Sequence, residues 1–201
     1  MGYLLNGLIN KKPKLKAARL DQYGQPGHNI LYVTGLSGSG KSTYSKELAK
    51  KLKAEVVELD SYYGAKPNDS QSDFHRYLSK NQVNTKRLVA NKKLNYNESD
   101  KIYGLLKEYA KDRRVIAEGV QLFDGTMAEK NKLRSDLSQE PILSLQVSRR
   151  KALRRAKERD QANWANVNLK EKKKEWRTQN NNKKEFERAM GLKRKHQDPF
   201  K

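Results

Sequence analysis

Apolar and polar positions change their period along the chain, and the pattern predicts strands that alternate with helices. Short apolar, β-branched runs predict four strands, at residues 30–34, 55–60, 114–120 and 142–147. Apolar residues at helical spacing predict helices over 41–53, 72–90, 99–111 and 149–177. This alternation is typical of a parallel sheet with helices on both faces. We therefore predict a three-layer α/β fold with a parallel sheet of about five strands.

The two ends of the chain lack this clear periodicity. Residues 1–29 are basic and punctuated by Pro13 and Pro26, and we expect them to form an N-terminal arm. The run NNNKK, at 180–184, predicts a break after the long charged helix. We therefore expect one central domain over 30–178 and a basic C-terminal tail over 179–201.

Charge is high and unevenly distributed. The 201 residues carry 44 Lys and Arg against 23 Asp and Glu, a formal net charge of +21. Residues 149–201 alone hold 19 of the cations and 7 of the anions. Such a balance favours polyanionic partners, which include nucleotides, nucleic acid and acidic lipid surfaces. The basic termini therefore make nucleic acid a candidate partner, while the oligomeric state stays open.

Composition also excludes several classes of protein. The chain contains no cysteine, which excludes a disulfide framework and a thiolate metal site. No apolar run approaches the ~18 residues that a membrane span needs. The first residues, MGYLLNGLINKKPK, lack the leading charge and apolar core of a signal peptide, and Asn6 breaks the myristoylation pattern. We expect a soluble cytoplasmic protein with no membrane partner.

A glycine-rich loop joins the first predicted strand to the first predicted helix. Residues 35–42 read GLSGSGKS and fit the phosphate-loop (Walker A) pattern G-x-x-x-x-G-K-[ST]. Glycines let backbone N–H groups turn towards a phosphate, and the helix N-terminus adds unpaired N–H groups and the positive end of its dipole. We expect Lys41 to reach the β- and γ-phosphates and the Ser42 hydroxyl to bind Mg²⁺. The predicted nucleotide-binding residues are Gly35, Ser37, Gly38, Ser39, Gly40, Lys41, Ser42 and Thr43.

Two acidic residues stand where later predicted strands end. Asp60 in LDSYYG and Glu118 in VIAEGV lie at carboxyl ends of strands, where ligands bind in open α/β sheets. Asp60 is a candidate base for the proton of an acceptor hydroxyl and a candidate metal ligand, although an isolated Asp here could simply cap a turn. Glu118 is a candidate magnesium ligand, directly or through water, as a Walker-B acid is.

The fourth predicted strand leads into an arginine-rich helix. Residues 148–160 read SRRKALRRAKERD, with several arginines on one helical face. A solvated charged helix is the usual explanation of such a run. After a strand of a phosphate-loop sheet, however, arginines can close over the phosphates and stabilise the charge in transfer. We take 148–177 as a predicted lid, with Arg150 and Arg155 as its candidate catalytic arginines.

Four segments, in this order, resemble the uridine kinase and phosphoribulokinase group of small-molecule kinases, a branch of the nucleoside monophosphate kinase-like fold. They are GLSGSGKST (35–43), DSYY (60–63), VIAEG (115–119) and SRRKALRRAKERD (148–160). The resemblance implies a P-loop NTPase fold and transfer of the γ-phosphate of ATP to a hydroxyl. It also implies that Asp60 is the base and that the lid begins near Arg149. The chain after DSYY and at both ends departs from the group, which leaves open whether the acceptor is a nucleoside, a sugar or a related small molecule.

Other functions fit the same motifs. A 5′-hydroxyl polynucleotide kinase or a zeta-toxin-like sugar-nucleotide kinase would also use a phosphate loop, an Asp base and an arginine lid. A non-enzymatic alternative is an ATP- and nucleic-acid-binding module of a larger, for example viral, assembly. A GTPase is disfavoured, because its N-K-x-D segment would need an acid where NKKL, at 91–94, has leucine. For every enzymatic alternative the expected cofactors are ATP and Mg²⁺.

Overall fold

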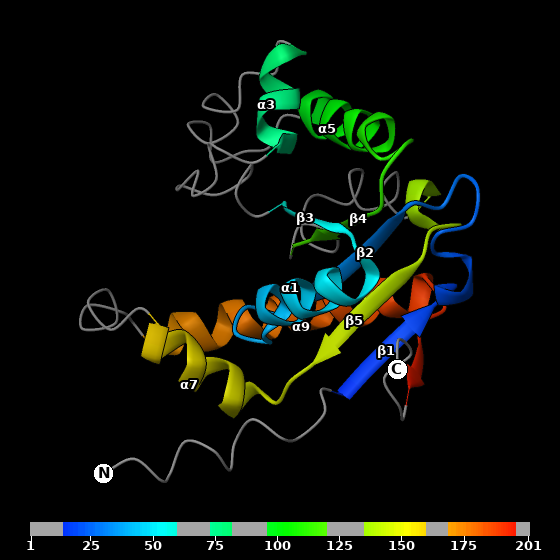
Figure 1. Ribbon diagram of the computed structural model, residues 1–201. Coiled ribbons are helices and arrows are strands. Elements are labelled where there is room, and N and C mark those ends of the chain that lie inside the picture. The colour runs from blue at the N-terminus through cyan, green and yellow to red at the C-terminus, as the bar shows by residue number, and fades with distance from the viewer. Residues whose placement is uncertain (1–13, 60–72, 82–95, 120–134, 160–168, 196–201) are drawn as a thin grey trace, which may run out of the picture.

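A single sheet organises the computed structural model, which describes residues 14–59, 73–81, 96–119, 135–159 and 169–195. Its six strands lie in the order β3-β4-β2-β5-β1-β6. Their bounds are β1 (Lys14–Ala18), β2 (Ile30–Gly35), β3 (Glu55–Glu58), β4 (Val115–Glu118), β5 (Ile142–Gln146) and β6 (Lys193–Lys195). The strands β3, β4, β2 and β5 pair in parallel, and β1 and β6 continue the sheet antiparallel at one edge (Figure 1).

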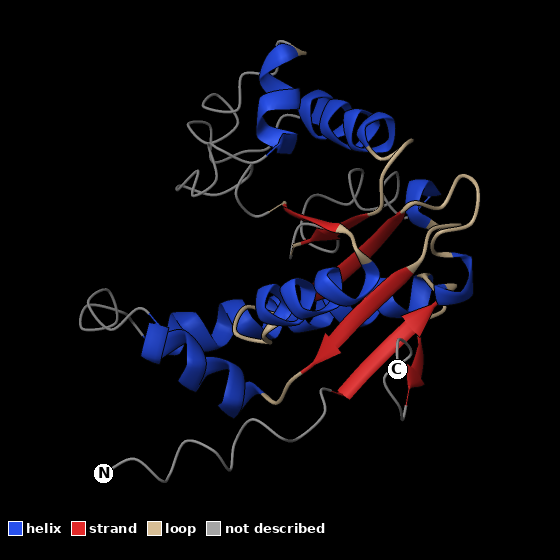
Figure 2. Ribbon diagram, viewed as in Figure 1, coloured by secondary structure: helices blue, strands red, loops and turns tan. Residues whose placement is uncertain are grey.

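Helices cover both faces of this sheet (Figure 2). They are α1 (Lys41–Leu52), α3 (Asp73–Lys80), α5 (Tyr96–Tyr109), α7 (Arg149–Arg159) and α9 (Leu169–Ala189), with a short 3₁₀ turn η1 (Leu20–Gln22). Helix α1 packs with Leu31 and Val33 on one face, whereas α3, α5 and α9 pack with Ile30 and Tyr32 on the other. This arrangement confirms the predicted α/β fold class. In the described part of the chain, no helix combines the length and apolarity that a bilayer span requires.

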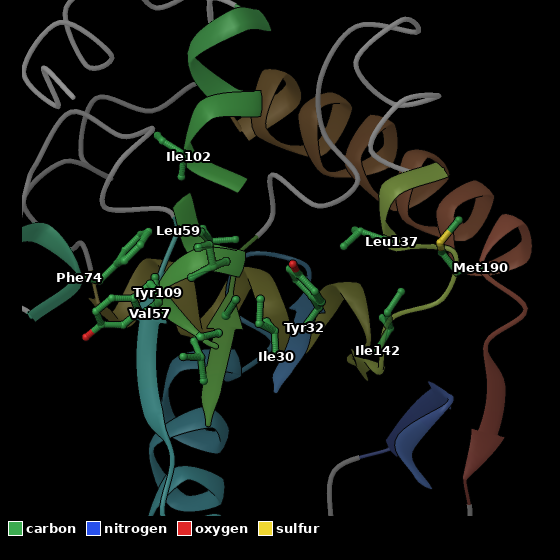
Figure 3. Packing of buried hydrophobic residues seen from close by; sticks show 14 of the residues in the cluster. Ile30, Tyr32, Val57, Leu59, Phe74, Ile102, Tyr109, Leu137, Ile142 and Met190 are labelled. Carbon is green, nitrogen blue, oxygen red and sulfur yellow. The ribbon is translucent and has the colours of Figure 1, made fainter. Parts of the chain in front are cut away.

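The central strands are buried on both faces. All residues of β2 and β4 are buried, which explains why these segments are apolar without alternation. Figure 3 shows Ile30 and Tyr32 pointing into the larger apolar cluster. In the same cluster the rings of Phe74 from α3 and Tyr109 from α5 lie 5.1 Å apart, centroid to centroid. The core therefore holds β2, and with it the loop that follows, in a fixed position.

Both ends of the described chain join the sheet, which differs from the predicted arm and tail. Residues 14–18 form β1, paired with β5, and residues 193–195 form β6. The predicted break at NNNKK is wrong, since α9 continues without interruption to Ala189. Leu15 and Ala17 are buried on one face of β1, while Lys16 lies opposite a buried carboxylate of α9. Lys16 is therefore accommodated in the sheet because it pairs with this carboxylate.

A buried ion network fastens α9 to the sheet edge. Glu187 is 2% exposed and accepts hydrogen bonds from Lys16 Nζ at 2.7 Å, Ser144 Oγ at 2.6 Å and Gln146 Nε2 at 2.7 Å. Lys183, one turn earlier on α9, also pairs with Glu187. Burial alone raises the pKa of Glu187, but Lys183, Lys16 and the Ser144 hydroxyl outweigh burial and lower this pKa to about 2. Because an unpaired buried charge is costly, these groups stabilise α9 only as a set.

Acidification is expected to lower the free energy of unfolding through this network. The folded pKa of Glu187 lies below its unfolded value of 4.5, so the contribution is complete above 4.5 and is lost as the pH falls towards about 2. That difference corresponds to about 3 kcal/mol. In urea unfolding, Glu187→Gln should be less stable near neutral pH and lose less stability on acidification. Glu47→Gln, exposed on α1, should keep the wild-type pH profile. An unchanged acid dependence in Glu187→Gln would contradict this assignment.

Candidate nucleotide-binding site

The glycine-rich loop joins β2 to α1 at the carboxyl edge of the parallel strands. Gly38 and Gly40 have left-handed backbones, with φ of 75° and 91°. The Ser39 N–H donates to the Leu36 carbonyl oxygen at 2.9 Å, and α1 begins immediately after Gly40. Because the first N–H groups of a helix have no partner inside it, they can bind an anion at this edge. The structure therefore provides the strand–loop–helix context that a phosphate loop requires.

Lys41, Ser42 and Glu118 meet at the start of α1. Glu118 ends β4, is 1% exposed, and accepts a hydrogen bond from Ser42 Oγ at 2.8 Å. Its second carboxylate oxygen lies 3.8 Å from Lys41 Nζ, and Lys41 is itself buried. The approach follows from sheet topology, since β4 lies beside β2 with Val33 in register with Glu118. An amine, a hydroxyl and a carboxylate are thus held together beside the loop.

Helix α7 lies against the other side of the loop. The Ala152 carbonyl oxygen lies 2.4 Å from the place that a Cβ on Gly38 would occupy, so the two backbones are in direct contact. Arg155 Nη1 donates to the carbonyl oxygens of Ser39 at 3.3 Å and Gly38 at 3.4 Å. The structure therefore places Arg155 at the loop, while Arg150 is exposed on the same helix.

Comparison with protein families identifies this architecture. Residues 30–189 match the model of a family described as AAA domain. The chain belongs to this AAA domain family. The match includes the loop, Glu118 and α7, and the family is of the P-loop NTPase type, so the site is a phosphate-loop nucleotide-binding site. No curated protein matches the chain.

The oxygen atoms beside the loop of the AAA domain fit magnesium. The Ser42 hydroxyl and the Glu118 carboxylate, 2.8 Å apart, are hard oxygen donors of the kind that Mg²⁺ prefers. Among the residues that the structure describes, no group of three His, Cys, Asp or Glu side chains gathers into a metal cage. Mg²⁺ normally binds through one or two carboxylates together with substrate phosphates and water, so this small donor set is suitable.

Replacing Gly38 by alanine is expected to displace α7 and weaken ATP binding by roughly tenfold or more. The new Cβ would meet the Ala152 backbone at 2.4 Å, and the backbone φ of 75° adds strain. Gly27→Ala is the matched control, because Gly27 has φ of 83° and nothing within 4 Å of its Cβ position. Titration with a fluorescent ATP analogue compares the two variants. Equal, small effects would show that the contact between α7 and the loop does not matter for binding.

The remaining predicted residues differ in what the structure shows of them. Gly35 and Ser39 are buried, Ser37 is half-buried, and Thr43 is exposed on the first turn of α1. Asp60 lies outside the described residues, so its roles as base and metal ligand stay predictions. The described segment that precedes Asp60 ends at Leu59. The Leu59 N–H donates to the Glu118 carbonyl oxygen at 2.8 Å, so this segment ends next to Glu118.

Two contacts at the site were missed by sequence reasoning. Thr34 is fully buried, and its Oγ1 donates to the Gly119 carbonyl oxygen at 3.2 Å, which ties β2 to the residue after Glu118. A hydroxyl residue directly before the first glycine of the loop is the signal that could have indicated this bond. The backbone contact between Ala152 and Gly38 left no comparable signal, because alanine has an apolar side chain and glycine has none.

Proposed function

We propose that this AAA domain is an ATP-dependent kinase that transfers the γ-phosphate to a hydroxyl of a nucleoside, a sugar or a related small acceptor, with Mg²⁺. The strongest support is the placement of Lys41, Ser42 and Glu118 together at the phosphate loop, with Arg155 on its other side. Phosphoryl transfer needs little covalent chemistry from the protein, and is accelerated mainly by positioning and by neutralisation of charge. These groups are of the types that such a reaction uses.

In this proposal each residue has a defined role. The loop N–H groups bind the β- and γ-phosphates, and the Lys41 ammonium neutralises charge on them. Ser42 and Glu118 would hold the Mg²⁺, which supplies Lewis-acid stabilisation of phosphate oxygens. Asp60 takes the proton of the acceptor hydroxyl while that oxygen forms a bond to the γ-phosphorus. The bond from the γ-phosphorus to the β,γ-bridging oxygen breaks, and ADP leaves.

Arg155 is the arginine of the proposed lid that would supply positive charge to the phosphates. Its guanidinium now donates to two neutral loop carbonyl oxygens, at 3.3 Å and 3.4 Å. Hydrogen bonds to a phosphate oxygen are charge-assisted and stronger than these, so a bound triphosphate offers Arg155 a better partner nearby. A small movement of α7 would then bring positive charge to the transferring phosphoryl group. Arg150, exposed on the same helix, is the second candidate for this role.

A second acceptor class has specific support. The formal net charge of +21 suits a 5′-hydroxyl polynucleotide better than an uncharged nucleoside or sugar. The same loop, base and lid would serve this reaction, and they would serve a zeta-toxin-like sugar-nucleotide kinase as well. The acceptor, rather than the chemistry at the γ-phosphate, separates these alternatives.

An acceptor screen tests the proposal. The protein is incubated with ATP labelled at the γ-phosphate, Mg²⁺, and separate panels of nucleosides, sugars, sugar nucleotides and 5′-hydroxyl oligonucleotides. The proposal predicts labelled product in one small-molecule panel and loss of labelling when EDTA removes the metal. Labelled oligonucleotides alone would select the polynucleotide kinase. ATP binding without label in any acceptor would reject the kinase assignment and support a binding module.

A further inference from the structure

We infer that one flank of α9 and the adjoining sheet edge bind the sugar–phosphate backbone of a nucleic acid strand. This surface, here called the cationic track, consists of Lys173, Arg177, Lys184 and Arg188 on α9 and Arg194 on β6. All five side chains are exposed. None of them belongs to the phosphate loop or to α7, although Lys173 and Arg177 lie within the predicted lid, 148–177.

Helical spacing places the four α9 cations on one flank. With about 100° per residue, positions 173, 177, 184 and 188 lie within about 60° of one another around the helix axis. Asn181, also exposed, lies between Arg177 and Lys184 along the axis, about 20° beyond the edge of this flank, and adds a neutral hydrogen-bonding group. At a rise of about 1.5 Å per residue, the row from Lys173 to Arg188 is about 22 Å long. The helix therefore presents a rigid, linear row of positive charge.

Packing of α9 shows which side this flank faces. Phe186 lies in the apolar cluster beneath the sheet. The next residue, Glu187, turns to β5 and to Lys16 of the edge-side strand β1, whose Nζ lies 2.7 Å away. Each residue turns the helix by about 100°, so Arg188 lies as far beyond Glu187 around the axis as Glu187 lies beyond Phe186. Arg188 therefore lies outside the core, on the side of strands β1 and β6. The flank that contains Arg188 therefore borders the sheet edge.

Strand register brings a cation of β6 to the same side. Arg194 is the antiparallel partner of Lys16, and directly paired residues project from the same face of a sheet. Because Lys16 reaches Glu187 of α9, this is the α9 face. Arg194 is exposed and lies one strand nearer the edge, so it extends the row of cations from the helix onto the sheet.

Carboxylates do not interrupt the row in the part of α9 whose side chains are described. Glu187 is 2% exposed, and its carboxylate is already paired within the buried ion network. Glu175 and Glu185 lie about 90° or more around the helix axis from the centre of the flank. Glu185 stands three residues before Arg188 but is half-buried, so exposed positive charge dominates the flank.

The chemistry of the track favours nucleic acid over a lipid surface. Membrane-surface helices set large apolar side chains beside their cations and bury them in the bilayer interface. In α9 the large apolar side chains Phe186 and Trp176 instead pack in or against the cluster under the sheet. Lys, Arg and Asn side chains are common partners of backbone phosphates, and a row about 22 Å long can follow several successive phosphates of one strand.

Removing charge from the track, compared with an equal removal elsewhere, tests the inference. Fluorescence anisotropy measures binding of the full chain to labelled mixed-sequence strands of about 20 nucleotides, as DNA and as RNA, over a range of salt concentrations. The track variant carries Lys184→Gln, Arg188→Gln and Arg194→Gln, all of them outside the predicted lid. The matched control carries Lys46→Gln, Lys50→Gln and Lys80→Gln, three exposed cations of α1 and α3.

We expect the track variant to bind at least about tenfold more weakly near 0.1 M salt, and the slope of log affinity against log salt to become shallower by about 2. The control should remain within about twofold of the wild type. Equal losses in the two variants would overturn the track, as would a wild-type chain that binds neither DNA nor RNA. Tighter binding to phosphatidylserine vesicles than to nucleic acid would also overturn it. Because ATP binding should persist in the track variant, failure here is distinguishable from failure of the kinase proposal.

Discussion

Replacing Lys41 by methionine is expected to lower kcat/KM for phosphoryl transfer by about 10²–10³-fold and to weaken ATP binding. The Lys41 ammonium is held 3.8 Å from the Glu118 carboxylate, and the side chain is only 8% exposed. In such a dry site a charge interacts more strongly with a phosphate than it would in water. Methionine keeps the apolar length of the side chain but removes the charge. Titration with an ATP analogue and single-turnover transfer of labelled phosphate give the two readouts.

Two further variants separate this effect from a loss of folding. Lys50→Met removes the same charge from an exposed position of the same helix and should behave like the wild type. Lys41→Arg keeps a positive charge beside the buried Glu118, which protects the fold from an uncompensated carboxylate. Its planar guanidinium does not reproduce a compact ammonium, so transfer should still be impaired. A folded Lys41→Met protein with normal transfer would remove Lys41 from the site.

The parallel core was predictable because its information is local. Strands β2, β4 and β5 are covered on both faces, so each is a short apolar run bounded by polar or glycine residues. The loop between β2 and α1 has a sequence pattern that only its phosphate-binding geometry explains well. Each of these elements can therefore be recognised from fewer than about ten consecutive residues.

The sheet edge and α9 were not predictable in this way, because their stability depends on distant partners. Lys16 and Glu187 are separated by 171 positions, yet the ion pair between them holds β1 and α9 together. Read alone, Lys16 indicates a solvated arm, and Lys183 and Glu187 indicate an exposed helix or a tail. A buried charge is tolerated only where a residue of opposite charge packs beside it. The hydrophobic pattern along the sequence does not show which distant residues will pack together.

The candidate site shows the same division between local and distant information. Lys41 and Ser42 are placed by the motif, whereas the choice between Arg150 and Arg155 depends on how α7 faces the loop. Ala152 touches Gly38, and Arg155 follows it by three residues, which places both on the side of α7 that faces the loop. The sequence shows that arginines share a helical face, but only packing shows which of them reaches the loop.

Replacing Asp60 by asparagine is expected to lower acceptor phosphorylation by about 10²–10⁴-fold while leaving ATP binding unchanged. Asparagine has nearly the same shape but cannot take a proton from the acceptor hydroxyl. The described residues before Asp60 lie beside the site, since Glu58 is in register with Glu118 and the Leu59 N–H donates to the Glu118 carbonyl oxygen. Asp73→Asn, at an exposed residue of α3, is the control and should keep wild-type turnover.

The same variant distinguishes the two roles predicted for Asp60. If Asp60 is the base, the loss of rate in Asp60→Asn should persist at every Mg²⁺ concentration. If Asp60 instead holds the metal, the variant should require more Mg²⁺, and saturating Mg²⁺ should restore much of the rate. Normal turnover in Asp60→Asn would exclude both roles and leave the proton of the acceptor to another group. The Mg²⁺ titration therefore tests the assignment of Asp60 independently of the identity of the acceptor.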